Sequence, residues 1–404
     1  MKKLLALLLT AVVSVGATVT LASCNKTAEK PFFGLITLHD ENSTYDKNFI
    51  DAFNAACEKK GVKGMIKSQI PENSQCYDAA AELADAGCKV VFADSFGHES
   101  FVLKAAKQFT DVQFCHATGT TAHTENQPNF HNAFASIYEG RYLAGVAAGL
   151  KLKAMMTADS TVQPVVGYVG AFTYAEVISG YTSWFLGVQS IVPTATMKVQ
   201  FTGSWYDETA EKEAANALID AGCVIISQHA DSMGAPSACE TKNVPNVSYN
   251  GSTEASCPNT FIISSRVNWE PYFEYIIDCV KNGEAIEYDY VGGLGDNFAD
   301  GSVSLTELGK KAPVEGTQAA LEAVAAQLKA GTLKVFDCSK FTVKNEHLTS
   351  YLADVDTDAE YTHETEVIKV ENGVTYFAES EFRSAPYFDL KIDGITLLNE
   401  KYGD

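Results

Sequence analysis

The sequence predicts an α/β protein of two similar lobes, each built on a mainly parallel sheet, with a hinge and a ligand cleft between them. Short buried strands alternate with helices along most of the 404 residues. One helix–glycine–strand unit occurs twice, at 82–92 (ELADAGCKVVF) and 217–227 (ALIDAGCVIIS). Such joints are common, but two lobes explain the recurrence better than one large domain. A chain of this length is also long enough for two or three domains.

The first lobe begins with alternating strands and helices. Apolar runs and helical periodicity predict, in order, a strand at 32–38, a helix at 47–60, a helix at 75–86, a strand at 89–93, a helix at 99–109 and a strand at 112–115. Helices of this length between strands imply parallel sheets that are covered on both faces.

The same pattern restarts in the second lobe. We expect a strand at 165–170, a helix at 176–191 and a strand at 197–201. The repeated units each end in polar residues, at 94–95 in the first lobe and at 229–232 in the second. Open parallel sheets bind ligands beyond the carboxyl ends of their strands. Two lobes that present these ends to each other therefore form a cleft.

The boundaries of the lobes follow from where the pattern breaks and restarts. We place residues 32–155 and about 267–288 in the first lobe, and about 156–266 and 289–404 in the second.

The character of the chain changes past residue 337. Alternating strands at 367–370 and 374–377 flank Asn372 and Gly373, a pair typical of a β-hairpin turn. We expect a small β-rich extension of the second lobe here, with the acidic stretch 354–366 as a solvated face.

The N-terminus has the pattern of a secretory signal peptide, which we assign to residues 1–23. Two lysines precede a nearly uninterrupted apolar stretch at 4–21, which runs into the sequence LASC at 21–24. This ending resembles the bacterial lipobox, in which the cysteine is acylated; a chance cysteine after an ordinary signal peptide is the alternative. We expect a lipid on Cys24, a short tether at 24–31, and attachment to the extracytoplasmic face of the membrane.

Charge and motifs exclude several functions. The 51 acidic against 30 basic side chains give a net charge of −21 with no basic stripe, which argues against a nucleic-acid partner. The chain contains neither a phosphate-binding glycine loop nor a Gly-x-Ser-x-Gly elbow, and its His and Cys lack zinc-ligand spacing. His229 beside Asp231 could form an acid/base pair, but no nucleophile accompanies it. We therefore expect no catalytic residues, no metal and no cofactor.

The ten cysteines give no disulfide assignment. The nine that follow Cys24 contain no Cys-x-x-Cys pair, and several sit in apolar settings that suit a small buried side chain.

Aromatic side chains beside hydrogen-bonding groups follow the predicted strands. Planar ligands stack on aromatic faces, and carboxylates accept hydrogen bonds from hydroxyl or ring N–H groups. Asp46 and Asp94 are the candidate acceptors and Phe172 and Trp205 the candidate stacking groups. Any one aromatic taken alone is more readily a core residue, and the position of Phe172 and Trp205 after predicted strands favours these two as site residues. The full set of candidate ligand-binding residues is Asp46, Asn48, Phe49, Asp94, Phe96, Phe172, Trp205, Asp231, Asn268 and Trp269.

Several of these residues lie in stretches that resemble a known family. The sequence resembles the basic membrane protein family of ABC-transporter substrate-binding lipoproteins, which includes purine nucleoside receptors, over nearly all of residues 31–340. The stretches that carry the resemblance are DKNF at 46–49, EGRYLAGVAA at 139–148, GSWYD at 203–207, QHADS at 228–232 and NWEPYF at 268–273. The resemblance implies a type I periplasmic-binding fold, with two Rossmann-like lobes, three crossovers and the ligand in the cleft. It also implies an aromatic sandwich on a purine base and an Asp near the N-terminus among the ligand contacts.

The sequence departs from the family pattern at three places. Ile50 replaces a usual Asn, Thr253 stands where a ribose-binding Asp is expected, and the Ser-rich strand that follows has no counterpart of the family's Lys. The departures bear on ribose recognition, so a free purine or another planar solute is as compatible with the sequence as a nucleoside.

The function that the resemblance implies is capture of a small solute and not catalysis. We expect an extracytoplasmic solute-binding lipoprotein that captures a purine nucleoside or purine base and delivers it to an ABC permease driven by an ATPase. A ligand-sensing lipoprotein for a signalling receptor is the first alternative, and a surface nucleoside hydrolase is the second.

Overall fold

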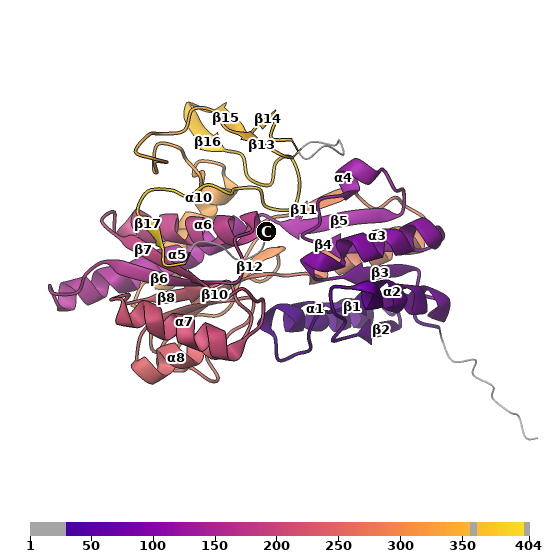
Figure 1. Ribbon diagram of the computed structural model, residues 1–404, viewed down its shortest axis with the longest axis horizontal. Coiled ribbons are helices and arrows are strands. Elements are labelled where there is room, and N and C mark those ends of the chain that lie inside the picture. Colours follow the sequence, from indigo (N-terminus) through magenta and orange to yellow (C-terminus); the bar gives the residue numbers. More distant parts are fainter. Residues whose placement is uncertain (1–29, 356–361, 400–404) are drawn as a thin grey trace, which may run out of the picture.

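Two mainly parallel sheets form the frame of the protein (Figure 1). The computed structural model describes residues 30–355 and 362–399. The predicted α/β fold of two lobes is confirmed. The predicted lipid attachment at Cys24 and the leader that precedes it lie outside the described residues.

The first lobe contains a six-stranded parallel sheet in the order β11-β5-β4-β3-β1-β2. Its strands are β1 (Phe33–Ile36), β2 (Gly64–Lys67), β3 (Val90–Ala93), β4 (Gln113–Ala117), β5 (Phe130–Ala135) and β11 (Asp289–Gly292). Its helices are α1 (Thr44–Lys60), α2 (Ser74–Ala86), the 3-10 turn η1 (Phe96–His98), α3 (Glu99–Gln108), α4 (Ala122–Glu125) and α9 (Glu270–Asn282).

Apolar side chains on both faces of this sheet explain why helices cover it twice. In β1, Phe33 and Leu35 point into a core shared with α1 and α9, while Ile36 points into a second core shared with α2 and α3. Side chains alternate between the two faces of a strand, so a strand that is apolar throughout needs cover on both sides.

The second lobe contains a seven-stranded sheet in the order β12-β10-β9-β8-β6-β7-β17, parallel except for the antiparallel strand β12. Its strands are β6 (Val165–Gly170), β7 (Thr196–Phe201), β8 (Ile226–Gln228), β9 (Asn246–Tyr249), β10 (Phe261–Val267), β12 (Val303–Leu305) and β17 (Ile395–Leu397). Its helices are α5 (Ile137–Ala158), α6 (Ala175–Ile191), α7 (Glu208–Asp220), α8 (Gly234–Lys242) and α10 (Thr317–Lys329).

The repeated sequence unit corresponds to α2–β3 in the first lobe and α7–β8 in the second. Gly87 and Gly222 follow the two helices with φ values of 110° and 91°, which residues with a side chain rarely adopt. The glycine in each unit therefore lets the chain turn directly from the helix into a buried strand.

The chain crosses between the sheets three times, between β5 and α5, between β10 and α9, and between β11 and β12. Two of the crossings differ from the expected boundaries. Helix α5 packs against α6 and β10 because its apolar residues join the core of the second sheet, so the part of 32–155 from residue 137 onward lies with the second lobe. Residues 289–292 pair with β5 and lie in the first lobe, although the sequence pattern places them in the second.

Helices α5 and α6 approach each other unusually closely. A Cβ atom built on Gly145 would lie 2.0 Å from the carbonyl oxygen of Trp184, and one on Gly187 would lie 2.1 Å from that of Tyr142. Only glycine fits at these two positions, so the backbones of the two helices are in direct contact.

Within its described residues, the C-terminal extension carries four short strands besides β17. It contains β13 (Leu352–Ala353), β14 (Thr365–Glu366), β15 (Ile368–Glu371) and β16 (Val374–Phe377). Strands β15 and β16 form the expected hairpin, with Glu371 opposite Val374 across the Asn-Gly turn. Phe336 and Phe388 stack at 4.3 Å within the same core as α5 and α6, so the extension is continuous with the second lobe.

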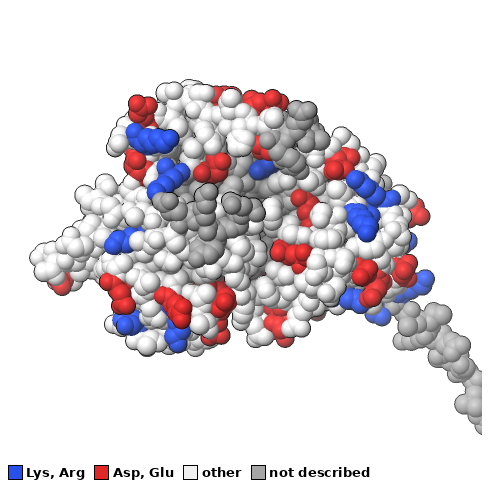
Figure 2. Space-filling view, viewed as in Figure 1, with Lys and Arg blue, Asp and Glu red and all other residues white. Residues whose placement is uncertain are grey.

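Acidic and basic side chains are interspersed over both lobes on the face seen in Figure 2. Within the described residues, no helix has the length and hydropathy that a membrane span requires.

Candidate functional site

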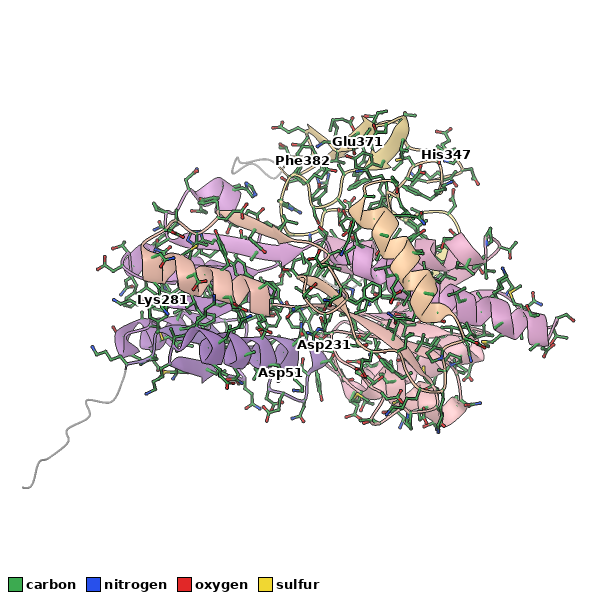
Figure 3. All side chains as sticks on the ribbon, turned by 180° about the vertical axis from the view of Figure 1, so that it is seen from behind. Asp51, Asp231, Lys281, His347, Glu371 and Phe382 are labelled. Atoms are coloured by element: carbon green, nitrogen blue, oxygen red, sulfur yellow. The ribbon has the colours of Figure 1, made fainter. Side chains whose placement is uncertain are left out.

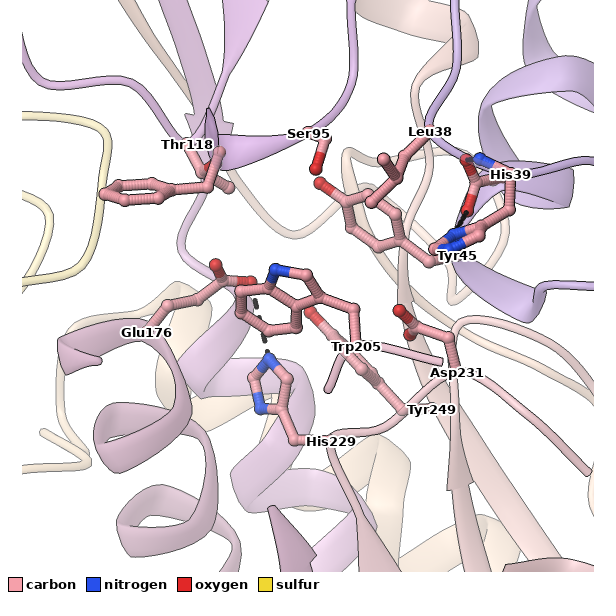
Figure 4. A pocket seen from close by; sticks show the side chains of 12 residues that line it. Leu38, His39, Tyr45, Ser95, Thr118, Glu176, Trp205, His229, Asp231 and Tyr249 are labelled. Carbon is pink, nitrogen blue, oxygen red and sulfur yellow. Dashed lines mark hydrogen bonds and ion pairs between the residues drawn. The ribbon is translucent and has the colours of Figure 1, made fainter. Parts of the chain in front are cut away.

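A cavity lies between the two lobes, where the carboxyl ends of their strands meet (Figure 4). Its free volume is about 20 Å³. The first lobe lines it with residues that follow β1, β3 and β4, and the second lobe with residues at or after the ends of β6, β7, β8 and β9. The lining residues are Leu38, His39, Tyr45, Asp46, Ser95, Phe96, Thr118, Glu176, Trp205, His229, Asp231 and Tyr249.

Asp46 is held in place by the first turn of α1. Ser43 caps this helix, accepting a hydrogen bond from the Asp46 N–H at 3.1 Å and donating one from its hydroxyl to Oδ2 of Asp46 at 2.6 Å. The His39 N–H donates to Oδ1 of Asp46 at 2.7 Å. Burial opposes ionisation, but the hydrogen bonds from His39 and Ser43 outweigh it and hold the pKa of Asp46 below its ordinary value. Asp46 is therefore a fixed carboxylate at neutral pH.

Asp231 faces Asp46 from the second lobe. Its backbone N–H donates to the carbonyl oxygen of Trp205 at 2.9 Å, which ties the loop after β8 to the loop after β7. Its carboxyl group points across the cleft towards the first lobe (Figure 4), and Figure 3 shows Asp231 at the junction of the lobes. Burial, together with the charges of Asp46, Glu211 and Glu176, raises the pKa of Asp231 well above its ordinary value. A protonated Asp231 can both donate and accept a hydrogen bond.

Glu176 and His229 belong to a chain of hydrogen bonds that starts at a buried arginine. Arg141 of α5 is fully buried, lies 3.7 Å above the ring of Tyr249, and donates to Nδ1 of His229 at 3.0 Å. An arginine can only donate, so Nδ1 must accept and the proton of the neutral ring lies on Nε2. Nε2 then donates to Oε1 of Glu176 at 3.4 Å. Burial lowers the pKa of His229, which keeps the ring neutral.

The two lobes contact each other directly around the cavity. The backbone N–H of Thr44 donates to the carbonyl oxygen of Asp231 at 3.0 Å, and its hydroxyl donates to the same oxygen at 3.2 Å. The ring of His39 lies 5.4 Å from that of Tyr206. These contacts join the first turn of α1 to the loops of the second lobe, so the cleft is closed in this structure.

The structure brings only part of the predicted ligand-binding set to the cavity. Four members line it, namely Asp46, Phe96, Trp205 and Asp231. Phe172 packs behind Trp205, with the ring centroids 5.0 Å apart, and supports that wall.

Asp94 lies beneath the cavity and does not line it. It is fully buried, and its Oδ1 accepts a hydrogen bond from the N–H of Leu38 at 3.1 Å. Burial and the nearby charge of Asp46 raise the pKa of Asp94 well above its ordinary value. The structure thus gives Asp94 a role in shaping the loop after β1.

The remaining candidates lie in the core or at the crossovers. Phe49 and Trp269 stack on each other at 4.6 Å inside the first lobe and are almost fully buried. The side-chain amide of Asn48 donates to the carbonyl oxygen of Val267, at the end of β10, and that of Asn268 donates to Ala299 at 3.2 Å. Both Asn side chains therefore connect segments that meet at the lobe junction.

Eight lining residues are absent from the predicted set. They are Leu38, His39, Tyr45, Ser95, Thr118, Glu176, His229 and Tyr249. Tyr249 ends β9, Thr118 directly follows β4 and Ser95 lies two residues after β3. A stricter use of the rule that parallel sheets bind ligands at strand ends would therefore have found them. Glu176 follows a longer loop, and nothing in the sequence marks its link to His229.

One departure from the family pattern, at Thr253, lies away from the cavity. Thr253 is buried and its hydroxyl lies 2.8 Å from that of Ser248, so it does not reach the cavity. Within the described part of the chain, no group of three or more His, Cys, Asp or Glu is arranged to hold a metal ion.

A two-lobed fold with a closed cleft of this kind defines a class of solute-binding proteins. The sequence profile of the family described as "ABC transporter substrate-binding protein PnrA-like" matches residues 36–308, more than half of the chain. The chain belongs to this family of ABC transporter substrate-binding proteins, which are binding proteins and not enzymes.

Two curated relatives are similar over part of their length. A purine-binding protein of Brucella abortus is 33% identical over 212 residues, which are 52% of this chain and 57% of that protein. A putative ABC transporter glucose-binding protein of Haloferax volcanii is 32% identical over 213 residues, which are 53% of this chain and 51% of that protein. The chain thus spans little more than half the length of these relatives.

Solved structures of low sequence identity share the fold. The solute-binding protein of an ABC transporter from Conexibacter woesei has a TM-score of 0.61 at 20% identity, over 75% of this chain and 98% of that chain. One from Aeropyrum pernix has a TM-score of 0.63 at 15% identity, over 76% and 93% of the two chains. These similarities confirm the type I periplasmic-binding fold.

Proposed function

We propose that the cleft captures a purine, and a free purine base in preference to a nucleoside, for delivery to an ABC permease. The observation that carries this proposal is the convergence of three carboxyl groups, those of Asp46, Asp231 and Glu176, beside the ring of Trp205 in one closed cavity. None of the twelve lining side chains is Lys or Arg. A site with many acceptors and an aromatic wall suits a flat, uncharged ligand that carries several N–H donors.

Purine bases meet these requirements. They are planar, and they combine N–H donors with ring-nitrogen acceptors along one edge. A protonated Asp231 matches such an edge, since its O–H can donate to a ring nitrogen while its carbonyl oxygen accepts from an N–H. Asp46, held ionised, supplies a second acceptor. The purine-binding relative from Brucella abortus supports the same ligand class.

The preference for the base rests on the missing ribose contacts. Thr253 replaces the carboxylate that the family resemblance leads us to expect, and its hydroxyl is engaged with Ser248. The glucose-binding description of the Haloferax volcanii relative makes a sugar the competing ligand, because sugars are also bound by carboxylates and aromatic rings.

Capture follows from closure of the cleft. A ligand that contacts both lobes binds the closed state more tightly than the open one and shifts the population towards it. In this proposal the closed protein, exported and anchored by a lipid on Cys24, is recognised by a membrane permease coupled to an ATPase.

Isothermal titration calorimetry tests the ligand class. We expect the purified protein to bind adenine or guanine more tightly than the corresponding nucleoside, and not to bind glucose. Asp231→Ala should weaken binding by about 1–3 kcal/mol, the scale of a lost hydrogen bond to a buried partner. Glu82→Ala, which removes an exposed carboxylate of α2 that is paired with Lys67, is the matched control. Chromatography of the recovered ligand should show it unchanged.

Two outcomes would contradict the proposal. Binding of glucose without binding of any purine would show that the ligand is a sugar and not a purine. Equal affinity of Asp231→Ala and the unmodified protein would show that Asp231 does not contact the ligand.

A further inference from the structure

The C-terminal extension reaches from the second lobe to the first. Its core belongs to the second lobe, and β17 pairs with β7 in the second sheet. Its 383–386 segment, however, contacts the first lobe. The backbone N–H of Ser384 donates to Oδ2 of Asp289 at 2.7 Å. Since β11 lies in the first sheet, this hydrogen bond joins the two lobes outside the ligand cavity.

The acceptor of this hydrogen bond is well anchored. Asp289 is the first residue of β11, its side chain is only 6% exposed, and the same Oδ2 lies 2.6 Å from Nε2 of His123 on α4. The carboxylate is therefore shared by a helix of the first lobe and by the extension.

The donor segment is held by hydrogen bonds of its own. The guanidinium of Arg383 donates to the carbonyl oxygen of Asp354 at 2.8 Å and to that of Ala385 at 3.2 Å. These bonds fix the turn that presents the Ser384 N–H.

The same segment forms a wall of a chamber beside the ligand cavity. The free volume of the chamber is about 170 Å³. Phe96, Thr118 and Glu176 line both the chamber and the ligand cavity. The extension adds Arg383, Ala385 and Pro386 to its lining. The segment thus stands directly beside the closed cleft and contacts the lobes on either side of it.

We propose that the 383–386 segment is a latch that holds the cleft closed and completes the wall beside the ligand site. The 383–386 segment lies beyond residue 308, where the match to the substrate-binding family ends. Because the extension moves with the second sheet and Asp289 with the first, the Ser384–Asp289 hydrogen bond requires the relative orientation of the lobes seen here. Each opening of the hinge has to break it.

Small-angle X-ray scattering of the ligand-free protein tests the latch without any ligand, and so independently of the proposed function. We expect Asp289→Ala to lower the ratio of closed to open protein about tenfold, the effect of losing a hydrogen bond to a charged acceptor, and hence to increase the radius of gyration. Asp289→Asn, whose amide oxygen can still accept, should restore much of the closed population. Glu125→Ala is the matched control, because it removes a carboxylate of α4 that pairs with Lys107 of the same lobe at 2.7 Å.

Ser384→Pro removes the same hydrogen bond from the side of the extension and keeps the test decisive where Asp289→Ala fails to fold. A radius of gyration that is unchanged in Asp289→Ala and in Ser384→Pro would overturn the proposal. Adenine provides a second readout, since its release, followed by tryptophan fluorescence in stopped flow, should be several-fold faster from Asp289→Ala. Absence of adenine binding would contradict the proposed ligand and leave the scattering result to decide on the latch.

Discussion

Replacing Glu211 with glutamine should change how the stability of the ligand-free protein depends on pH. Glu211 lies on α7, is fully buried, and accepts hydrogen bonds from the N–H of Ser232 with both oxygens at 3.2 Å. It therefore supports the loop that carries Asp231. Burial raises the pKa of Glu211 from 4.5 to about 7, against the lowering effect of its hydrogen bonds.

The direction and size of the effect follow from this pKa. Between pH 4.5 and about 7, the folded protein keeps a proton on Glu211 that the unfolded chain has lost. The contribution of this proton to the free energy of unfolding is therefore fully present below pH 4.5, and it is lost as the pH rises through about 7. The shift corresponds to roughly 3 kcal/mol of unfolding free energy, at about 1.4 kcal/mol per pKa unit. Glu211→Gln removes this loss, because an amide stays neutral at every pH.

Urea unfolding at about pH 4.5 and about pH 8 measures the effect. We expect the two proteins to be of similar stability at the lower pH, and Glu211→Gln to be the more stable by roughly 3 kcal/mol at the higher pH. Glu139 and Glu379, whose pKa values burial also raises to about 7, are present in both proteins and cancel in the comparison. A difference between the two proteins that stays constant with pH would refute the reasoning.

Three further predictions concern the ligand wall, the helix contact and the thiols. Trp205→Ala should weaken purine binding by about 1–3 kcal/mol, the scale of base–aromatic stacking, and calorimetry that finds full affinity would exclude a stacking role. Gly145→Ala should destabilise the protein by about 1–3 kcal/mol in urea, because the new Cβ would lie 2.0 Å from the carbonyl oxygen of Trp184; Gly293→Ala, where a Cβ meets nothing within 4 Å, is the control and should be near neutral. The nine described cysteines are buried and free, and burial raises the pKa of each thiol. Ellman's reagent should therefore react with them only after unfolding, and rapid reaction with the folded protein would contradict their burial.

Most of the fold can be predicted from local sequence. The strand predicted at 165–170 has the bounds that the structure shows, and the Asn-Gly hairpin forms around the predicted turn. These elements are specified by nearby residues, through apolar runs and turn chemistry. The crossovers are harder to predict. Helix α5 joins the second lobe because it packs against α6, and no local sequence pattern indicates this contact.

The candidate site shows the same division. The rule that parallel sheets bind ligands at strand ends selected Asp46, Trp205 and Asp231, and these residues line the cavity. Phe49 and Trp269 carry the same kind of pattern but are buried against each other, because α1 and α9 pack on one face of the first sheet. The sequence shows that an aromatic residue lies near a strand end, but not on which side of the loop its ring lies.

The buried arginine behind the cavity has a consequence for the evolution and design of specificity. Arg141 is not among the residues that line the cavity, yet it decides which nitrogen of His229 carries the proton, and thereby leaves Glu176 as an acceptor. A substitution of Arg141 in α5 would free the ring to invert its donor and acceptor. The pattern of hydrogen-bond donors and acceptors that the cavity presents to a solute thus depends partly on a residue of α5 that does not line the cavity. Variants that change the preferred solute can therefore arise without any change in the residues that contact it.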